Sequence, residues 1–376
     1  MTTETGLASG TFRVDSRAPT RVDLAGGTLD IWPLYLFLKD PLTINLAIDL
    51  FAEAHLETTP GHGRVKLQAQ DQKAEVELTW DTLESTRVPP SLELHAKLLR
   101  HYRALRVKAG HADSARDLSL STLARSPAGA GLGGSSALSV ALVGALTSWE
   151  ISEGGTSTGA GHSVDPLTHG ERWIDVVRDV ETTVIQVPAG LQDYYGAMFG
   201  GLQQLGWRAG RHERSWMEQK TFEKLEQRLL LFYSGQSRNS GINNWALFKA
   251  FIDKQGEVRN QFEGIAAATQ ELAQALKAED WRGVEKAIAA EWTIRRGIAA
   301  GISTAEIDHA FAVAAEDGVR AGKVCGAGGG GCFFLLLPEE NPELKARVQK
   351  RIVDLGIRAL PFRAVPRGLS VQVSRA

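Results

Sequence analysis

The 376-residue sequence has few sulfur-containing residues, with two cysteines and three methionines, and it has no long apolar run. Two cysteines, Cys325 and Cys332, cannot build a disulfide framework, and no paired histidine cluster indicates a zinc site. We therefore expect reduced thiols in a cytoplasmic protein. No apolar run approaches the ~18 residues that span a bilayer, and no basic region followed by an apolar core opens the chain. We expect neither a membrane protein nor a secreted one.

An excess of charge of one sign is also missing. The formal net charge is −2, from 42 Lys and Arg against 44 Asp and Glu, which argues against a general nucleic-acid binder. With 43% hydrophobic and 23% charged residues, the composition indicates neither disorder nor a coiled coil. No internal repeat is visible, and the length allows two domains that share a large core.

Glycine is abundant, above all in one stretch. Residues 118–123 alternate apolar and polar side chains and predict a strand, and residues 135–149 are apolar without proline and predict a buried helix. Between them lie four glycines in six positions, Gly129, Gly131, Gly133 and Gly134. The backbone N–H groups at a helix start have no helical partners and commonly bind phosphate. The stretch therefore predicts a phosphate-binding turn, with Ser135 and Ser136 where the helix begins; an ordinary turn without a ligand is the alternative.

Two better-known glycine motifs overlap this stretch, and neither fits. The spacing G-x-G-x-x-G is present, but a polar loop follows the helix where a dinucleotide-binding unit needs an apolar second strand. The sequence thus disfavours a dehydrogenase. The Walker pattern fails because Ser135 occupies the lysine position. Other groups must then carry the charge of a bound phosphate.

Three charged residues elsewhere have two interpretations each. Asp30 follows a glycine pair, and it either binds ligand hydroxyls or caps a helix that begins at Ile31. Asp193 follows a Pro/Gly turn and is either a helix cap or a catalytic carboxylate. Arg21 lies in an apolar stretch, where it either extends to the surface or points at an anionic site.

The element pattern predicts an α+β protein with two domains, residues 1–204 and 205–376. In the first part we expect strands over 11–24, 42–50, 51–57, 65–69, 74–80 and 118–123, and helices over 91–109, 135–149 and 167–184. In the second part we expect strands over 228–233, 332–337, 358–365 and 369–373, and helices over 243–253, 262–277, 281–298, 304–321 and 342–355.

Three segments, residues 19–30, 127–137 and 323–332, together resemble the signature motifs of the GHMP kinases. That family includes galactokinase, homoserine kinase, mevalonate kinase and phosphomevalonate kinase. The order and spacing also match, and the resemblance covers nearly the whole chain. Residues 190–201 are most similar to the sugar kinases of the heptose 7-phosphate and fucose kinase branch. The resemblance implies an N-terminal domain like ribosomal protein S5 domain 2, a ferredoxin-like C-terminal domain, and an active site between them.

The resemblance also implies roles for individual residues. ATP would be bound by Pro127, Gly129, Gly131, Gly133, Gly134, Ser135 and Ser136. Mg²⁺ would be bound by Ser136 and Glu181, which lies near the end of the helix predicted over 167–184. Asp193 would be the catalytic acid with Arg21 beside it, and the substrate would contact Asp30, Gly190, Gly328 and Gly329. Arg238 lies in a polar segment after a strand and is our candidate for binding a substrate phosphate. The alternative is that this segment is a polar surface turn without a ligand.

The expected function is ATP-dependent phosphorylation of a hydroxyl on a sugar or sugar phosphate, with heptose 7-phosphate as a candidate. A free-sugar kinase of the fucose or galactose type is one alternative. A catalytically silent sugar-binding homologue is another, disfavoured because Ser136, Glu181 and Asp193 are all present. The chain departs from this branch at Tyr194, where many of its members have glutamine. That departure concerns the substrate rather than phosphoryl transfer.

Overall fold

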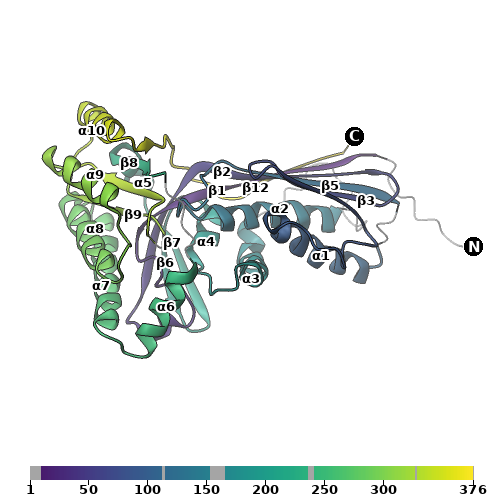
Figure 1. The fold of residues 1–376 in the computed structure, drawn as a ribbon, viewed down its shortest axis with the longest axis horizontal. Coiled ribbons are helices and arrows are strands. Elements are labelled where there is room, and N and C mark those ends of the chain that lie inside the picture. Colours follow the sequence, from purple (N-terminus) through teal and green to yellow (C-terminus); the bar gives the residue numbers. More distant parts are fainter. Residues whose placement is uncertain (1–9, 112–114, 153–165, 236–240, 327, 376) are drawn as a thin grey trace, which may run out of the picture.

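The computed structural model describes residues 10–111, 115–152, 166–235, 241–326 and 328–375. The described strands form two sheets, one of eight strands and one of four. Figure 1 shows the larger sheet on the right of an elongated molecule and the smaller one on the left. Both sheets carry helices, so the predicted α+β class is confirmed.

The larger sheet has the order β12-β1-β2-β5-β3-β4, and β6 and β7 extend it from β2. Its strands are β1 (Phe12–Ala25), β2 (Leu42–Pro60), β3 (Arg64–Ala69), β4 (Ala74–Thr79), β5 (Arg116–Ala124), β6 (Leu202–Arg208), β7 (Arg211–Trp216) and β12 (Ser370–Arg375). β2 is one long strand where the sequence predicts two runs, because it pairs with β1 along most of its length. The boundary expected after residue 204 falls inside β6, and β12 returns from the chain's end to pair with β1. The division into two domains at that residue stays a prediction.

Four helices cover one face of the larger sheet, below it in Figure 1. They are α1 (Glu93–Lys108), α2 (Gly134–Ser152), α3 (Pro166–Ile185) and α4 (Gln192–Phe199). α2 packs against the sheet and against the other three helices, which is why it is apolar on every side. The sequence predicts α1, α2 and α3 but misses α4, whose eight residues are too few to show a helical period.

The smaller sheet is antiparallel throughout, in the order β11-β8-β10-β9. Its strands are β8 (Leu229–Tyr233), β9 (Ala321–Val324), β10 (Cys332–Leu336) and β11 (Arg358–Ala359). The remaining helices are α5 (Gln219–Arg228), α6 (Gly241–Ile252), α7 (Val258–Lys277), α8 (Trp281–Arg296), α9 (Ala305–Glu316) and α10 (Pro342–Asp354), with short 3₁₀ helices at Leu34–Phe37 and Pro90–Leu92. The strand expected over 358–365 is only two residues long, and α5 was not predicted. Both cysteines are buried and free, and no helix in the described part of the chain is long and apolar enough to cross a membrane.

The two glycine-rich loops, one from each sheet, touch each other. The N–H of Cys332 donates to the carbonyl of Ala130 at 2.8 Å. A Cβ atom at Gly131, whose φ is +76°, would lie 2.4 Å from the carbonyl oxygen of Cys325. Only glycine permits both this φ and this approach. The density of glycine in both motifs is therefore explained in part by the close contact between the loops.

Candidate active site

A cavity of 480 Å³ opens beside the glycine-rich loop that follows β5. Its wall includes residues of that loop, the start of α2, the end of α3, the start of α4 and the turn after β1. The sequence-predicted residues among its lining are Arg21, Asp30, Pro127, Gly129, Gly131, Gly133, Gly134, Ser135, Ser136, Glu181, Gly190 and Asp193. The fold thus brings together residues that are up to 172 positions apart in the chain.

Strand β1 holds the glycine loop in place. The backbone N–H of Arg21 donates to the carbonyl of Leu132 at 3.0 Å, and its Nη1 donates to the carbonyl of Gly131 at 2.7 Å. α2 begins at Gly134, so the N–H groups of its first turn lack helical partners at the cavity wall. This is the local geometry that favours a phosphate group.

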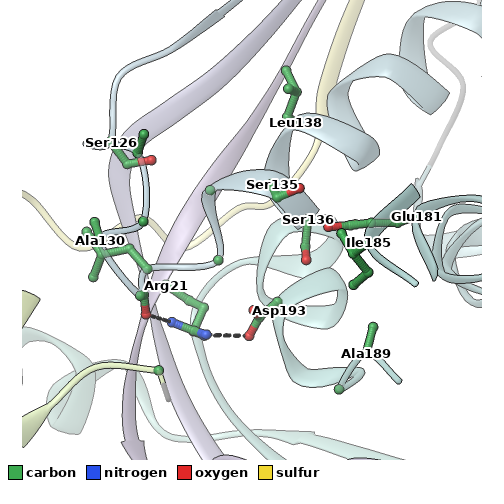
Figure 2. A pocket seen from close by; sticks show the side chains of 18 of the residues that line it. Arg21, Ser126, Ala130, Ser135, Ser136, Leu138, Glu181, Ile185, Ala189 and Asp193 are labelled. Carbon is green, nitrogen blue, oxygen red and sulfur yellow. Dashed lines mark hydrogen bonds and ion pairs between the residues drawn. The ribbon is translucent and has the colours of Figure 1, made fainter. Parts of the chain in front are cut away.

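Arg21 and Asp193 form the ion pair that was predicted between them. Nε of Arg21 donates to Oδ1 of Asp193 at 2.8 Å, and Nη2 lies 2.5 Å from the same oxygen. Burial alone would lower the pKa of Arg21, but the negative charges of Asp193 and Asp23 outweigh it and raise that pKa. The side chain of Asp193 is 25% exposed, and Figure 2 shows it beneath the glycine loop. Both contacts go to Oδ1, so Oδ2 takes no part in this ion pair.

Ser136 and Glu181 meet beside Asp193, as Figure 2 shows. Both side chains are buried, and Ser139 donates to Oε2 of Glu181 at 2.9 Å. Burial raises the pKa of Glu181, while the hydroxyl groups around it act in the opposite direction. A hydroxyl and a carboxylate are hard oxygen ligands of the kind Mg²⁺ prefers. The described residues contain no group of three His, Cys, Asp or Glu that could hold a metal, so a cation here would need oxygens from phosphate and water as well.

Asp30 is a helix cap, but for a different helix from the one expected. Its Oδ2 accepts from the backbone N–H of Gln192 at 2.9 Å, at the first residue of α4. The interpretation that it caps a helix starting at Ile31 is wrong, because the next helical residue is Leu34 and its cap position is Pro33. Asp30 also lines the cavity, so hydroxyl binding stays a prediction.

Burial raises the pKa of Asp30 to about 7, and the hydrogen bond from Gln192 opposes that rise. Between about pH 4 and pH 7 the folded protein then holds a proton that the unfolded chain has released. Stability must therefore fall as the pH rises through this window. We expect the unfolding free energy of the wild type, relative to Asp30→Asn, to fall by roughly 2 kcal/mol between about pH 5 and pH 8. Urea unfolding across this range tests it; parallel pH profiles for the two proteins would contradict a raised pKa.

Three predicted residues do not line this cavity or cannot be placed in it. Gly328 and Gly329 lie against Ile302, whose carbonyl accepts from Gly329 N–H at 2.8 Å. Gly326 of the same motif lines the cavity instead. Arg238 lies outside the described residues.

The lining also includes residues that sequence reasoning missed, among them Asp71 and Gln72 from the turn between β3 and β4. Two polar residues in a turn carry no signal of a site. Tyr194 was noted only as a departure from the branch, and its side chain is completely buried in the core beneath the larger sheet.

Comparison with known proteins decides the family. The model for the GHMP kinase N-terminal domain matches residues 96–201, and the model for the GHMP kinase C-terminal region matches residues 272–354. The chain belongs to the GHMP kinase family. It is therefore a small-molecule phosphotransferase of a family that uses ATP. The GHMP kinase fold, with its N- and C-terminal domains and two sheets, accounts for the architecture in Figure 1.

Several relatives of this GHMP kinase act on sugars. A D-glycero-alpha-D-manno-heptose 7-phosphate kinase from Campylobacter jejuni is 23% identical over 90% of this chain and 93% of that protein. An L-fucokinase/L-fucose-1-P guanylyltransferase from Bacteroides fragilis is 24% identical over 90% of this chain but only 36% of that protein. The crystal structure of a D-glycero-D-manno-heptose 1-phosphate kinase from Bacteroides thetaiotaomicron superposes with a TM-score of 0.70 at 20% identity, covering 96% of this chain and 99% of that one. At these identities the superposition shows a shared fold.

Proposed function

We propose that this GHMP kinase transfers the γ-phosphoryl group of ATP to a hydroxyl of a sugar or sugar phosphate, with heptose 7-phosphate as the first candidate. The observation that carries the proposal is the convergence of Asp193, Arg21, Ser136 and Glu181 on one cavity beside a helix start. Sugar kinases among the relatives support the substrate class.

The chemistry follows from this arrangement. The substrate oxygen forms a bond to the γ-phosphorus, the bond from that phosphorus to the oxygen it shares with the β-phosphate breaks, and the hydroxyl proton passes to Asp193. Glycine-loop N–H groups and the N-terminus of α2 would bind the phosphates, replacing the lysine of a Walker motif. Ser136 and Glu181 would hold Mg²⁺, which when bound neutralises phosphate charge. Arg21 keeps the Asp193 carboxylate oriented.

One observation favours the second candidate, a free-sugar kinase. Among the described residues that line the cavity, Arg21 is the single cationic side chain, and Asp193 already pairs with it. A sugar phosphate needs a cation for its distal phosphate. Arg238 is the sequence-predicted candidate for that cation.

An ATP-coupled assay on matched pairs of sugars and sugar phosphates separates the two candidates. For a heptose phosphate kinase we expect turnover of the sugar phosphate, and we expect Arg238→Ala to raise KM for it at least ~10-fold more than for the matching free sugar. Arg367→Ala, which removes a cation beyond the cavity lining, is the control. Turnover of free sugars with none of any sugar phosphate would exclude the heptose phosphate and leave the free-sugar kinase.

A further inference from the structure

Tyr194 has a buried hydroxyl that the fold alone does not explain. The side chain is completely buried in α4, directly after Asp193. The groups that face its hydroxyl are the Glu181 carboxylate and the Ser136 hydroxyl. Among the described residues, however, that hydroxyl makes no hydrogen bond of regular geometry. A buried hydroxyl without a partner destabilises the folded state, and phenylalanine would fill the same space without that penalty.

Of the two groups next to the Tyr194 hydroxyl, the Glu181 carboxylate is the one whose orientation matters for metal binding. The Ser139 hydroxyl lies 2.9 Å from its Oε2 and 3.0 Å from the carbonyl oxygen of Ser135, and these two acceptors share its single proton. The contact with Oε2 restrains one side of the carboxylate from α2. Tyr194 comes from α4, so the Glu181 carboxylate of α3 has hydroxyl groups from two different helices as neighbours. A carboxylate that binds a metal is commonly oriented by such outer hydrogen bonds, and their loss weakens metal affinity by about 10–100-fold.

We infer that Tyr194 is a positioning residue: when a divalent cation binds, its hydroxyl donates a hydrogen bond to the Glu181 carboxylate and fixes that carboxylate for the cation. A tyrosine hydroxyl is protonated at neutral pH and is able to donate. The Ser139 and Tyr194 hydroxyls would then hold Glu181 from two directions. The inference rests on the proposed role of Glu181 in holding Mg²⁺. It explains why a buried position carries tyrosine, whose hydroxyl is otherwise unpaired, rather than phenylalanine.

Binding of Mn²⁺ to the full chain in the presence of ADP tests this inference, with electron paramagnetic resonance reporting free Mn²⁺. We expect Tyr194→Phe to raise the Kd for Mn²⁺ by about 10-fold, and Glu181→Gln to raise it at least as much. Tyr195→Phe is the matched control, because Tyr195 is the next residue of the same helix and is also buried, but its ring packs against Phe199, Trp207 and His212. It should leave the Kd unchanged.

Stability measured without metal separates positioning from packing. If the Tyr194 hydroxyl is unpaired in the free protein, Tyr194→Phe should unfold at the same urea concentration as the wild type or a higher one. A clear loss of stability with an unchanged Mn²⁺ titration would assign Tyr194 to the core and overturn the inference. So would a wild-type Kd for Mn²⁺ in Tyr194→Phe, or one in Glu181→Gln. No sugar is present in these titrations. Their result therefore tests Tyr194 even if the proposed sugar substrate is wrong.

Discussion

Replacing Asp193 with asparagine should lower kcat by about 10²–10⁴-fold, the range by which a positioned general base contributes. The amide oxygen of asparagine can still accept the Arg21 hydrogen bond that Oδ1 accepts at 2.8 Å. The fold and the ATP site should therefore survive. What the variant loses is the negative charge and the proton acceptor. Steady-state kinetics should show the loss in kcat, with little change in KM for ATP.

Asp179→Asn is the control for this variant, because Asp179 is an exposed carboxylate of α3 that forms an ion pair with Arg178 at the surface. Its kcat should match that of the wild type. Near-normal turnover in Asp193→Asn would remove Asp193 from the mechanism. Comparison with Asp193→Ala divides its role further. A larger loss for alanine than for asparagine would indicate that the side chain orients the hydroxyl, since the amide can still do that and a methyl group cannot.

The local parts of this site can be predicted from the sequence. The strand, the glycine turn and α2 are consecutive in the chain, and each has its own pattern of alternation, glycine or apolar residues. The end of α3 with Glu181 is also a local pattern. The pairing of Arg21 with Asp193 was expected only from the resemblance to the GHMP kinases, because neither local sequence indicates that the two residues are in contact.

Other parts depend on contacts between distant segments, which leave no local trace. Asp30 caps α4 from 162 positions away, so the sequence suggested a cap for the wrong helix. The positions of Gly328 and Gly329 are set by Ile302 in the loop between α8 and α9. A glycine run does not show which of its members will face a cavity. The partners of Lys323 are equally invisible in the sequence, since one of them, Asp23, is 300 positions away.

Four buried charged residues link the two sheets through ion pairs. Lys323 of β9 is completely buried, and its Nζ lies 2.9 Å from Oδ2 of Asp23 in β1 and 3.0 Å from Oε1 of Glu291 in α8. Arg295 pairs with Glu291 at 2.7 Å and donates to the carbonyl of Gly27, in the turn that leads to Asp30. Burial alone would raise the pKa of Asp23, but the charge of Lys323, followed by those of Arg295 and Arg21, lowers it below its usual value.

Lys323→Met should therefore destabilise the protein by about 3–5 kcal/mol, the cost of removing one partner from a buried ion pair. The methionine fills most of the space, but Asp23 and Glu291 are left close together, with Arg295 and Arg21 as the cations whose charges still act on Asp23. Urea unfolding at neutral pH measures the loss. Lys220→Met is the matched control, because Lys220 pairs with Glu279 at the surface with its side chain 64% exposed, and such pairs contribute about 0–1 kcal/mol.

The pH dependence of this loss tests its electrostatic origin. Without Lys323, Asp23 and Glu291 should bind a proton more readily in the folded protein than in the unfolded chain. The folded state then holds more protons than the unfolded one at mildly acid pH, so the stability of the variant should rise, relative to the wild type, as the pH falls from about 8 to 5. Adding Glu291→Gln to Lys323→Met should recover part of the loss at neutral pH, since it removes one of the two crowded charges. A deficit as small as that of Lys220→Met, or one that does not change with pH, would show that the cluster is not what ties β1 to β9 and α8.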